Sequence, residues 1–217
     1  MEVLLIDHMG SDLSVVNAAR VSFAKKHMEF DEQSDIKLIN YLAKHNHWSP
    51  FGHASMQFHI KAPVFVARQL VKHQVGLVWN ELSRRYVDEG VEFYEPEVWR
   101  GRPKNSKQGS SNEVIDINPS GDRGPTLINE YQQVLNSAEW TYNYLLKMGV
   151  SPEQARIVLP QSLYTEWYWS GTLYAFARVC NLRCKPDSQK ETQNVGWGID
   201  KFARKLFPAS WHALRDA

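Results

Sequence analysis

The sequence predicts an α+β fold with a small central antiparallel sheet of about four strands, flanked by helices. Apolar and polar residues alternate over 56–61, which predicts a half-buried strand. Residues 125–148 read instead as one long helix, closed by Gly149. The chain has 217 residues, so we expect one large domain over residues 1–217 with a sizeable core.

The first half of the chain contains three candidate strands and two candidate helices. The strands are 2–7, a short segment expected to be buried, then 56–61, and finally 85–94. The helices are 35–44, for which Ser34 is the expected N-cap, and 63–74, where Pro63 suits the first turn.

Residues 95–124 differ in composition from the rest of the chain. They contain three prolines, several glycines and the polar run 104–112. A segment of this length inside one domain is usually a mobile loop with a function. A linker between two domains is the alternative, which is disfavoured because neither flank reads as a complete unit.

The second half of the chain is predicted to be mainly helical. Its elements are a helix at 152–160 with a capping box formed by Ser151 and Gln154, a strand at 163–169, a helix at 172–183, and a helix capped at Ser188 that ends at Phe207. Gly196 and Gly198 inside the last helix cost about 1 kcal/mol each relative to alanine, and they would permit a close contact with a neighbouring segment.

Composition restricts the function and the compartment. Lys and Arg total 25 and Asp and Glu total 24, and this net charge of +1 argues against a generally basic nucleic-acid-binding protein. Cys180 and Cys184 are expected to be reduced thiols of an intracellular protein. Signal-peptide and membrane-span patterns are absent, so we expect a soluble cytoplasmic protein (host cytoplasm for a viral chain) without membrane or nucleic-acid partners.

The densest group of polar side chains is the segment 68–86, RQLVKHQVGLVWNELSRRY. On a helix, Arg68 and Lys72 would share one face, and an anion such as phosphate would relieve their repulsion. Residues 80–86 add donors and acceptors of every kind, which suits a small ligand with a base and a phosphate. For the predicted helix that carries Arg68 and Lys72, a solvated surface without a ligand is the simpler alternative.

Two further basic positions lie later in the chain. Residues 178–193 mix Arg and Lys with amides and carboxylates. Arg156 stands among apolar neighbours in ARIVLP, so it is expected to be buried and to need a carboxylate, phosphate or carbonyl partner. A structural ion pair and a ligand contact are equally open for it.

Five histidines fall within 45–73, but no HExxH motif or paired-cysteine site accompanies them, so no metal is expected. His45 and His47 are expected to cap a helix or to contact a nucleotide, and His59 to lie at the surface. Phosphate-loop and serine-nucleophile motifs are absent, and neither cysteine lies in a known nucleophile motif. An enzyme with this sequence would take its reactive group from a cofactor.

The segment 68–86 resembles the signature of the flavin-dependent thymidylate synthases, in which Arg-His-Arg precedes a serine by seven or eight residues. Here Lys72-His73-Gln74 is followed by eight residues and then Ser83. Further matches run along nearly the whole chain, namely NAARVSF (17–23), WSPFGH (48–53), KAPVFVARQ (61–69), EFYEP (92–96), ARIVLP (155–160) and NLR (181–183) followed by Gln189 and Glu191.

The resemblance implies reductive methylation of dUMP at C5 to give dTMP. The family uses bound FAD as hydride carrier, methylenetetrahydrofolate as carbon donor and NADPH as reductant. No protein nucleophile attacks the uracil, which agrees with the missing nucleophile motif. The family builds its active sites between the subunits of a homotetramer, and we expect the same assembly here.

The resemblance assigns the roles of the family's site residues to the matching positions of this sequence. Arg183 matches the catalytic arginine that binds uracil and favours its N3-ionised form. The resemblance implies dUMP contacts at Gln69, Leu70, Val71, Lys72, Glu81, Leu82, Ser83, Arg84, Arg85, Arg156 and Arg183. It implies FAD contacts at Ser22, Ser49, Lys72, His73, Gln74, Glu81, Thr172, Tyr174 and Arg178. His47 and His53 are further candidates on the flavin and folate side.

The departures from the family pattern fall mainly on the flavin side, whereas the uracil side is nearly intact. The departing residues are Gly52, where the family often has glutamate, Lys72 and Gln74 in place of arginine, and Thr172, Tyr174 and Arg178 in place of Asn, Arg and Asn. We expect Arg178 to replace the charge lost at Tyr174, because the two are four residues apart on one helix.

Two other functions remain open. An inactive homologue would bind dUMP but fail in flavin chemistry because of Lys72 and Gln74. A nucleic-acid-binding module would use Arg84, Arg85 and Tyr86 as a basic and aromatic platform. The near-zero net charge argues against the second alternative.

Overall fold

The computed structural model describes residues 1–105, 109–118 and 126–216, and it is an α+β protein as predicted. Four strands, β1 (Glu2–Met9), β2 (Ser55–Pro63), β3 (Leu77–Glu81) and β4 (Tyr164–Thr172), form one antiparallel sheet in the order β1-β2-β4-β3. The α-helices in the described residues are α1 (Asp12–Arg20), α2 (Glu32–Lys44), α3 (Val64–Leu70), α4 (Leu127–Lys147), α5 (Pro152–Ala155), α6 (Leu173–Arg183), α7 (Lys190–Leu206) and α8 (Pro208–Asp216).

The chain forms two compact units whose segments alternate along the sequence. The first unit comprises Met1–Lys61, Gln69–Asn80 and Trp167–Ala217, and the second comprises Ala62–Arg68 and Glu81–Glu166. One domain over residues 1–217 stays a prediction.

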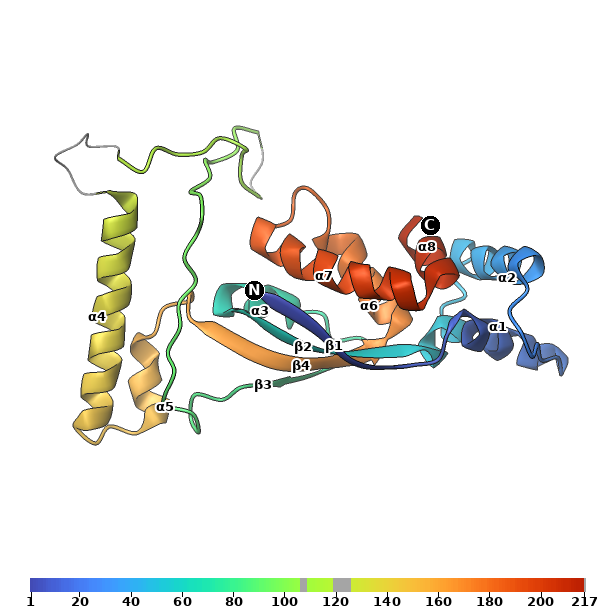
Figure 1. Ribbon diagram of the computed structural model, residues 1–217, viewed down its shortest axis with the longest axis horizontal. Coiled ribbons are helices and arrows are strands. Elements are labelled where there is room, and N and C mark those ends of the chain that lie inside the picture. The colour runs from blue at the N-terminus through green and yellow to red at the C-terminus, as the bar shows by residue number, and fades with distance from the viewer. Residues whose placement is uncertain (106–108, 119–125, 217) are drawn as a thin grey trace. The chain divides into compact units, whose positions relative to one another are not determined.

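In the first unit, α6 and α7 lie across one face of the sheet (Figure 1). The side chains under these helices are large and apolar. Phe58 of β2, Trp169 of β4 and Phe176 of α6 are fully buried, and the Phe176 ring meets the other two edge-on at centroid distances of 5.2 and 5.3 Å. Edge-to-face contacts of this kind stabilise beyond simple burial. The alternation over 56–61 is confirmed, since Met56 and Ile60 are buried as well.

The strand expected at 2–7 is confirmed as β1, but the expectation that it is buried is wrong. β1 runs on to Met9, and each of its eight residues is exposed or half-buried. It lies at the edge of the sheet and pairs with β2, with an irregularity between Leu5 and Asp7. An edge strand is covered from one side only, so its side chains stay open to solvent.

Helix α2 begins three residues before the predicted start because Asp31, not Ser34, is its N-cap. The Asp31 carboxylate accepts a hydrogen bond from the Ser34 N–H at 2.5 Å. Aspartate and serine are both good caps, and the carboxylate three residues earlier satisfies the free amide of the first turn.

The helix expected over 63–74 is shorter than predicted. Pro63 ends β2, and α3 ends at Leu70. Gly76 has a φ of 76°, a left-handed conformation that suits glycine, and it leads the chain into β3. Lys72 therefore lies in a turn beyond α3, and the expected helical face shared by Arg68 and Lys72 is not formed.

The strand expected at 85–94 is wrong, and β3 lies just before it. The Val87 N–H donates to the Ser83 carbonyl at 3.1 Å, and Gly90 has a φ of 66°. These turn features replace the extended backbone that a strand needs. Within 85–94, Phe93 makes one isolated bridge to Leu163.

The long helix predicted at 125–148 is confirmed as α4 in the second unit. The Thr126 hydroxyl caps it by accepting from the Asn129 N–H at 3.0 Å, and Gly149 follows it with a φ of 84°. Helix α5 lies against α4 (Figure 1) and continues into a 3-10 turn, Arg156–Val158. Ser151 makes no side-chain cap bond, so the expected capping box is not formed.

Residues 95–105 and 109–118 contain no helix or strand, and Arg100 and Val114 form an isolated bridge between them. The ring of Trp99 meets that of Tyr131 on α4 edge-on, with centroids 5.4 Å apart. Residues 106–108 and 119–125 lie outside the described part of the chain. Mobility of this loop stays a prediction.

The C-terminal elements confirm the helices α6 and α7 and add α8, which the sequence analysis missed. The expected cap at Ser188 is wrong, because α7 begins at Lys190 after Gln189 and no side chain caps it. Pro208 begins α8 instead of ending the helical region. The two carboxylate oxygens of Asp12, at the start of α1, accept from the N–H groups of Ala209 and Ser210 at 2.9 Å each. A residue almost 200 positions earlier in the chain thus supplies the N-terminal cap of α8.

Within the described residues, no helix is both long enough and apolar enough to cross a membrane.

Candidate active site

The centre of the candidate site is Arg183, the last residue of α6. Its Nε donates to Nε2 of His73 at 3.0 Å, and one of its terminal nitrogens donates to the Gln69 carbonyl at 3.3 Å. Helix α6 begins after Thr172, whose hydroxyl accepts from the Ala175 N–H at 3.2 Å, and it ends at Arg183. The structure thus brings Arg183 together with two predicted site residues, Gln69 and His73, that lie more than 100 positions earlier in the sequence.

The environment keeps His73 neutral. Burial, together with the nearby charges of Arg183 and Arg178, lowers the pKa of His73 to about 4. Its Nε2 accepts from Arg183, so the single ring proton is assigned to Nδ1. Burial also lowers the pKa of Arg183, but arginine remains a cation at neutral pH. The pair is therefore one fixed cation with a neutral partner that does not repel it.

Gln69 joins this pair to the start of α7. The side-chain oxygen of Gln69 accepts from the Thr192 hydroxyl at 3.1 Å, and its nitrogen donates to the side-chain oxygen of Gln189. Sequence reasoning noted Gln189 only as a family match and missed Thr192. Thr192 follows Gln189 by three residues at a predicted helix start, and that spacing is the signal that could have identified it.

Arg183 retains donors for a ligand. A guanidinium carries five N–H groups in one plane, and the contacts to His73 and Gln69 use two of them. The remaining N–H groups are on the two terminal nitrogens, whose parallel arrangement matches two neighbouring acceptors on a planar group. The site can therefore hold and polarise a planar, partly anionic ring.

The predicted contacts from 81 to 85 and Arg156 belong to the second unit. Glu81 accepts from the Thr165 hydroxyl at 2.8 Å. The guanidinium of Arg84 donates to the carbonyls of Glu89 and Gly90 at 2.5 and 3.0 Å, so Arg84 mainly stabilises its own turn.

The other cations of the second unit are more open. The guanidinium of Arg85 lies 5.2 Å from the ring centre of Tyr86 and 3.5 Å, through Nε, from the Ser83 hydroxyl. Arg156 is exposed, so the expectation that it is buried among apolar neighbours is wrong. It starts the 3-10 turn after α5, directly after the buried Ala155. Arg85 and Arg156 are thus available to an anion.

The predicted flavin contacts of the first unit are on several elements. Ser22 lies in the 3-10 turn Val21–Phe23, Ser49 opens a second such turn, Ser49–His53, and Lys72 and Gln74 follow α3. Tyr174 and Arg178 are one turn apart on α6, as expected, and the Tyr174 ring lies 6.2 Å from that of Trp48. Leu70 is fully buried, so it contributes to the core and not to a side-chain contact with substrate.

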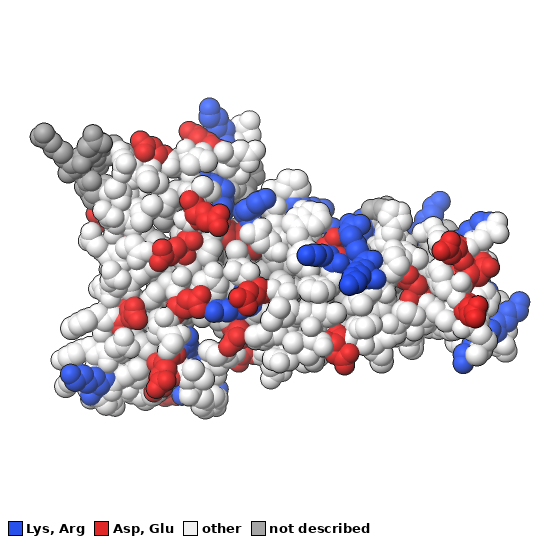
Figure 2. All heavy atoms as spheres, in the orientation of Figure 1, with Lys and Arg blue, Asp and Glu red and all other residues white. Residues whose placement is uncertain are grey.

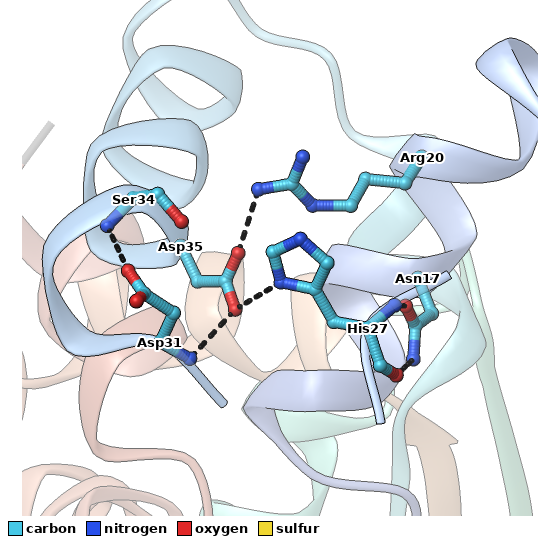
Figure 3. A network of polar contacts seen from close by, with 6 residues as sticks. All are labelled: Asn17, Arg20, His27, Asp31, Ser34 and Asp35. Carbon is cyan, nitrogen blue, oxygen red and sulfur yellow. Dashed lines mark hydrogen bonds and ion pairs between the residues drawn. The ribbon is translucent and has the colours of Figure 1, made fainter. Parts of the chain in front are cut away.

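The turn that carries Ser22 is held by a polar network between α1 and α2 (Figure 3). The buried carboxylate of Asp35 accepts from Arg20 at 2.8 Å, from the Asp31 N–H at 2.9 Å, and contacts His27 Nδ1 at 3.1 Å. Burial alone would raise the pKa of Asp35, but these hydrogen bonds outweigh it and the pKa lies below its ordinary value.

The same network contains a second clamp. The Asn17 side chain donates to the carbonyl and accepts from the N–H of His27, at 3.0 and 2.8 Å (Figure 3). The Ser22 turn therefore has a defined conformation although its neighbours Val21 and Phe23 are exposed.

Both cysteines are free, as predicted. Burial raises the pKa of the Cys180 thiol, whereas a hydrogen bond from Cys180 lowers the pKa of Cys184. The two line a cavity of about 410 Å³ with Asn181, Lys185, Pro186 and Arg215. Gln69 and His73 are not among its lining residues, so this cavity is separate from the Arg183 contacts.

The histidine-rich segment shows ring contacts. His45 follows α2 as its C-terminal cap residue, and its ring lies 4.4 Å from that of Tyr41. His59 is half-buried on β2 beside Tyr168, with ring centres 5.2 Å apart. No three His, Cys, Asp or Glu side chains within the described part of the chain are arranged to hold a metal ion.

On the face shown in Figure 2, acidic and basic side chains are interspersed, apart from a group of basic side chains over α6 and α7. This face therefore lacks the broad basic surface that a nucleic-acid-binding module uses.

Comparison with known proteins identifies the family to which this chain belongs. A family model described as thymidylate synthase complementing protein matches residues 4–209. The chain belongs to the flavin-dependent thymidylate synthase family, as the resemblance predicted.

Several relatives match over nearly the full chain. A flavin-dependent thymidylate synthase of Thermus thermophilus is 39% identical over 99% of this chain and 75% of its own length. One of Thermotoga neapolitana is 40% identical over 98% of this chain and 89% of its own length. Among solved structures, a UMP/dUMP methylase from Streptomyces cacaoi bound with 5-Br dUMP has 31% identity and a TM-score of 0.85, covering 99% of this chain and 94% of that one.

Proposed function

We propose that this chain methylates dUMP at C5 to give dTMP, with methylenetetrahydrofolate as carbon donor, FAD as hydride carrier and NADPH as reductant. Membership of the flavin-dependent thymidylate synthase family supports the reaction class. The similar Streptomyces cacaoi structure holds a brominated dUMP, which supports the pyrimidine nucleotide as substrate.

The observation that carries the proposal is the contact between Arg183 and His73. A uracil that loses its N3 proton is an anion with charge on N3 and the carbonyl oxygens. The remaining N–H groups of Arg183 can donate to two of these neighbouring acceptors and stabilise the ionised ring. Neutral His73 holds the guanidinium by Nε without adding a competing charge. Ionisation raises electron density at C5, which is the carbon that must accept the methylene group.

The residues of the first unit also fit a flavin nucleotide. The fit rests on the chemistry of the donor set: Lys72 and Arg178 supply cations for phosphates, Ser22 and Ser49 supply hydroxyl donors, and Gly52 leaves space beside an exposed aromatic ring. Gln74, His73, Thr172 and Tyr174 complete the set for FAD, and the Thr172 hydroxyl can still donate its own proton although it accepts from Ala175. When bound, FAD would supply the hydride.

A mechanism without a protein nucleophile agrees with the state of the thiols. Cys180 is fully buried, and burial raises its pKa, which keeps it as an unreactive thiol. Cys184 faces a cavity whose lining includes neither Gln69 nor His73.

For the phosphate and ribose of dUMP, we propose Arg85 and Arg156 as the cations, with Glu81 and Ser83 as further polar contacts. Arg85 and Arg156 are exposed, so neither has to give up a buried partner to meet a phosphate. Main-chain groups of Val71 and Leu82, and of Leu70, would complete the contacts. Arg84 would not bind substrate through its side chain, because its guanidinium already holds the 84–90 turn.

We further propose that the protein is a cytoplasmic homotetramer with active sites shared between subunits. The rings of Trp140 and Tyr144 on α4 stack at 5.2 Å although 65% and 47% of these residues are exposed. Tryptophan and tyrosine are enriched at protein–protein interfaces. Light scattering during size-exclusion chromatography would measure the mass, and a monomer of 25.1 kDa would contradict the assembly.

The experiment that tests the function is formation of dTMP from dUMP with FAD, NADPH and methylenetetrahydrofolate. We expect turnover by the native chain, and a loss of at least a hundredfold with Arg183→Ala. Binding of FAD should change little in that variant, since Arg183 is assigned to uracil. The matched control is Arg204→Ala, which removes another arginine, one that pairs with Asp200 on α7.

Product formation separates the three functions that remained open. If dUMP binds but no dTMP forms under reducing conditions, the inactive homologue is correct. Tight, steeply salt-dependent binding of single-stranded nucleic acid, without nucleotide turnover, would instead support the nucleic-acid module.

A further inference from the structure

A cavity of about 410 Å³ lies at the end of α6, apart from the contacts that Arg183 makes. Its lining residues are Cys180, Asn181, Cys184, Lys185, Pro186 and Arg215. Lys185 and Pro186 are exposed, so the cavity reaches the surface of the protein. The proposed reaction uses neither of the two thiols, and it therefore gives this cavity no role.

Cys184 is the thiol that a small molecule in this cavity can reach. It is the first residue after α6 and is 8% exposed, whereas Cys180, one turn earlier, is fully buried. A Cβ atom at Gly196 would lie 3.0 Å from the Cys184 sulfur, so α7 closes that side of the thiol. A group that bonds to this sulfur must therefore lie in the cavity, beside Lys185.

The surroundings of Cys184 favour its thiolate. A hydrogen bond from Cys180 is the largest cause of the lowered pKa of Cys184. The charges of Arg215 and Arg204 lower this pKa as well, whereas burial and the carboxylate of Asp200 act in the opposite direction. The thiolate is the form of cysteine that attacks a disulfide, so Cys184 is suited to exchange with one.

The two charged residues of the cavity lining are both cations, Lys185 and Arg215. The Nε of Arg215 donates to the Asp200 carboxylate at 2.9 Å, and a terminal nitrogen donates to the side-chain oxygen of Asn181. These contacts hold the guanidinium in place and use two of its five N–H groups, so others can donate to a ligand. The cavity therefore favours a molecule that carries carboxylates and repels one that carries amines.

Helix geometry opposes a disulfide between Cys180 and Cys184 themselves. The Cys184 N–H donates to the Cys180 carbonyl at 3.0 Å, so the two residues keep a helical spacing. Cβ atoms one helical turn apart are about 5–6 Å from each other, whereas a disulfide brings them to about 4 Å. A group bonded to Cys184 is therefore not displaced by Cys180 while α6 stays folded.

We propose that Cys184 is a site of reversible modification, where it exchanges with a small disulfide whose carboxylates are bound by Lys185 and Arg215. The Cys184 sulfur bonds to one sulfur of the reagent, the S–S bond of the reagent breaks, and its other sulfur leaves as a thiolate. Cys184 is thereby oxidised to a mixed disulfide and the released half of the reagent is reduced. An excess of free thiol reverses the exchange. The site does not depend on the proposed function.

The test compares three disulfides on the full-length protein: glutathione disulfide, which is acidic, 2-hydroxyethyl disulfide, which is neutral, and cystamine, which is basic. Mass spectrometry of the protein and its peptides gives the rate at Cys184. Dividing each rate by that for the neutral thiol N-acetylcysteine amide removes the reagent's own reactivity. At low ionic strength we expect the acidic disulfide to react about tenfold faster than the basic one. Cys184→Ser should take up no group.

Lys185→Gln tests the cations of the cavity directly. We expect it to reduce the preference for the acidic disulfide about threefold, because one of two cations is lost. The matched control is Lys201→Gln, which removes an exposed lysine of α7 that is not among the lining residues and should keep the native preference. Both lysines are exposed, so both variants should keep the native melting temperature.

Three results would contradict the proposal. Equal normalised rates for the three reagents would show that the cavity does not select carboxylates. Absence of reaction at Cys184 in the folded protein would show that the thiol is closed to the cavity. An internal Cys180–Cys184 disulfide in place of the bound group would show that the end of α6 opens and expels it. None of these results bears on the formation of dTMP, so the proposed function is tested separately.

Discussion

Arg183 Nε donates to His73 Nε2 at 3.0 Å, and this contact requires His73 to be neutral. The two side chains come from α6 and from the turn after α3, 110 residues apart in sequence. Burial, the largest cause, and the charges of Arg183 and Arg178 lower the pKa of His73 to about 4. Protonation would put a second cation against Arg183, so the contact and the neutral state depend on each other.

The first prediction is a stability slope between pH 6.5 and 4. In the unfolded chain His73 has an ordinary pKa near 6.5, and in the folded protein a lower one, so in this range the unfolded state binds more protons. The free energy of unfolding therefore falls as the pH drops from 6.5 towards 4, and the effect is complete near the folded pKa. Urea unfolding at pH 7, 6 and 5 would measure it.

The control for this slope is His73→Gln, which keeps an acceptor for Arg183 and cannot titrate. We expect a shallower loss of stability with falling pH in this variant than in the native chain. Equal slopes in the two proteins would show that His73 has an ordinary pKa in the folded state.

The second prediction concerns the Asp35 network (Figure 3). Asp35→Asn preserves shape but leaves Arg20 without its charged partner, and removal of one member of a buried pair typically costs about 3 kcal/mol. Chemical denaturation should show a loss of this size, and the Ser22 turn should become more sensitive to proteolysis. Glu32→Gln, an exposed change on the same helix, is the control and should alter stability by less than about 0.5 kcal/mol.

Asp35 also gives the stability a second pH dependence. Its pKa is lowered in the folded state because hydrogen bonds outweigh burial, so its contribution is present at pH values above its ordinary pKa of 3.8. That contribution disappears as the pH falls through the lower folded pKa. Asp35→Asn should remove this part of acid denaturation, and an unaltered acid transition would contradict the role given to Asp35.

The elements with strong local patterns could be predicted from the sequence, whereas those fixed by distant contacts could not. The long helix α4 has a threonine cap and a terminal glycine, and both signals are local. Helix α8 was missed because its cap is Asp12, whose carboxylate meets Ala209 and Ser210 only in the folded chain. The strand at 85–94 was wrong because turn-forming contacts at Ser83 and Gly90 override its β-forming residues.

In the candidate site, too, contacts between residues far apart in the sequence could not be predicted. Gln69, His73 and Arg183 were found through the family signature, because motif residues can be matched without knowing their distances. Thr192 carries no motif signal, and its contact to Gln69 exists only after α7 has packed beside the end of α3. The exposure of Arg156 was also missed, because its apolar neighbours in sequence are themselves partly exposed in the short turn after α5.

The third prediction tests the cap of α8. Asp12→Ala leaves the N–H groups of Ala209 and Ser210 without their acceptor and removes a negative charge from a helix N-terminus. We expect a loss of about 1–2 kcal/mol in unfolding free energy with no change in dUMP affinity. Asp12→Asn should recover part of the loss, since it keeps one acceptor. A stability equal to that of the native chain would show that solvent replaces the cap.

The fourth prediction compares two glycines of α7 that make different close contacts. A Cβ at Gly196 would meet Cys184 Sγ at 3.0 Å and Arg183 Cβ at 3.6 Å, whereas a Cβ at Gly198 would meet Val3 Cγ2 at 2.8 Å. Gly196→Ala requires the Cys184 side chain, which directly follows Arg183, to give way by a few tenths of an ångström, and we expect this shift to reach Arg183 and lower dUMP affinity about tenfold.

Gly198→Ala is the matched variant for that comparison, because it gains the same helix propensity and disturbs β1 instead. It should lower the melting temperature with little effect on dUMP binding, and Val3→Ala should restore part of the stability by removing Cγ2, the closest atom. Both quantities can be measured on the same preparations by calorimetry. If the two variants weaken dUMP binding equally, general loosening of α7 explains the effect, and the specific link from Gly196 to Arg183 is wrong.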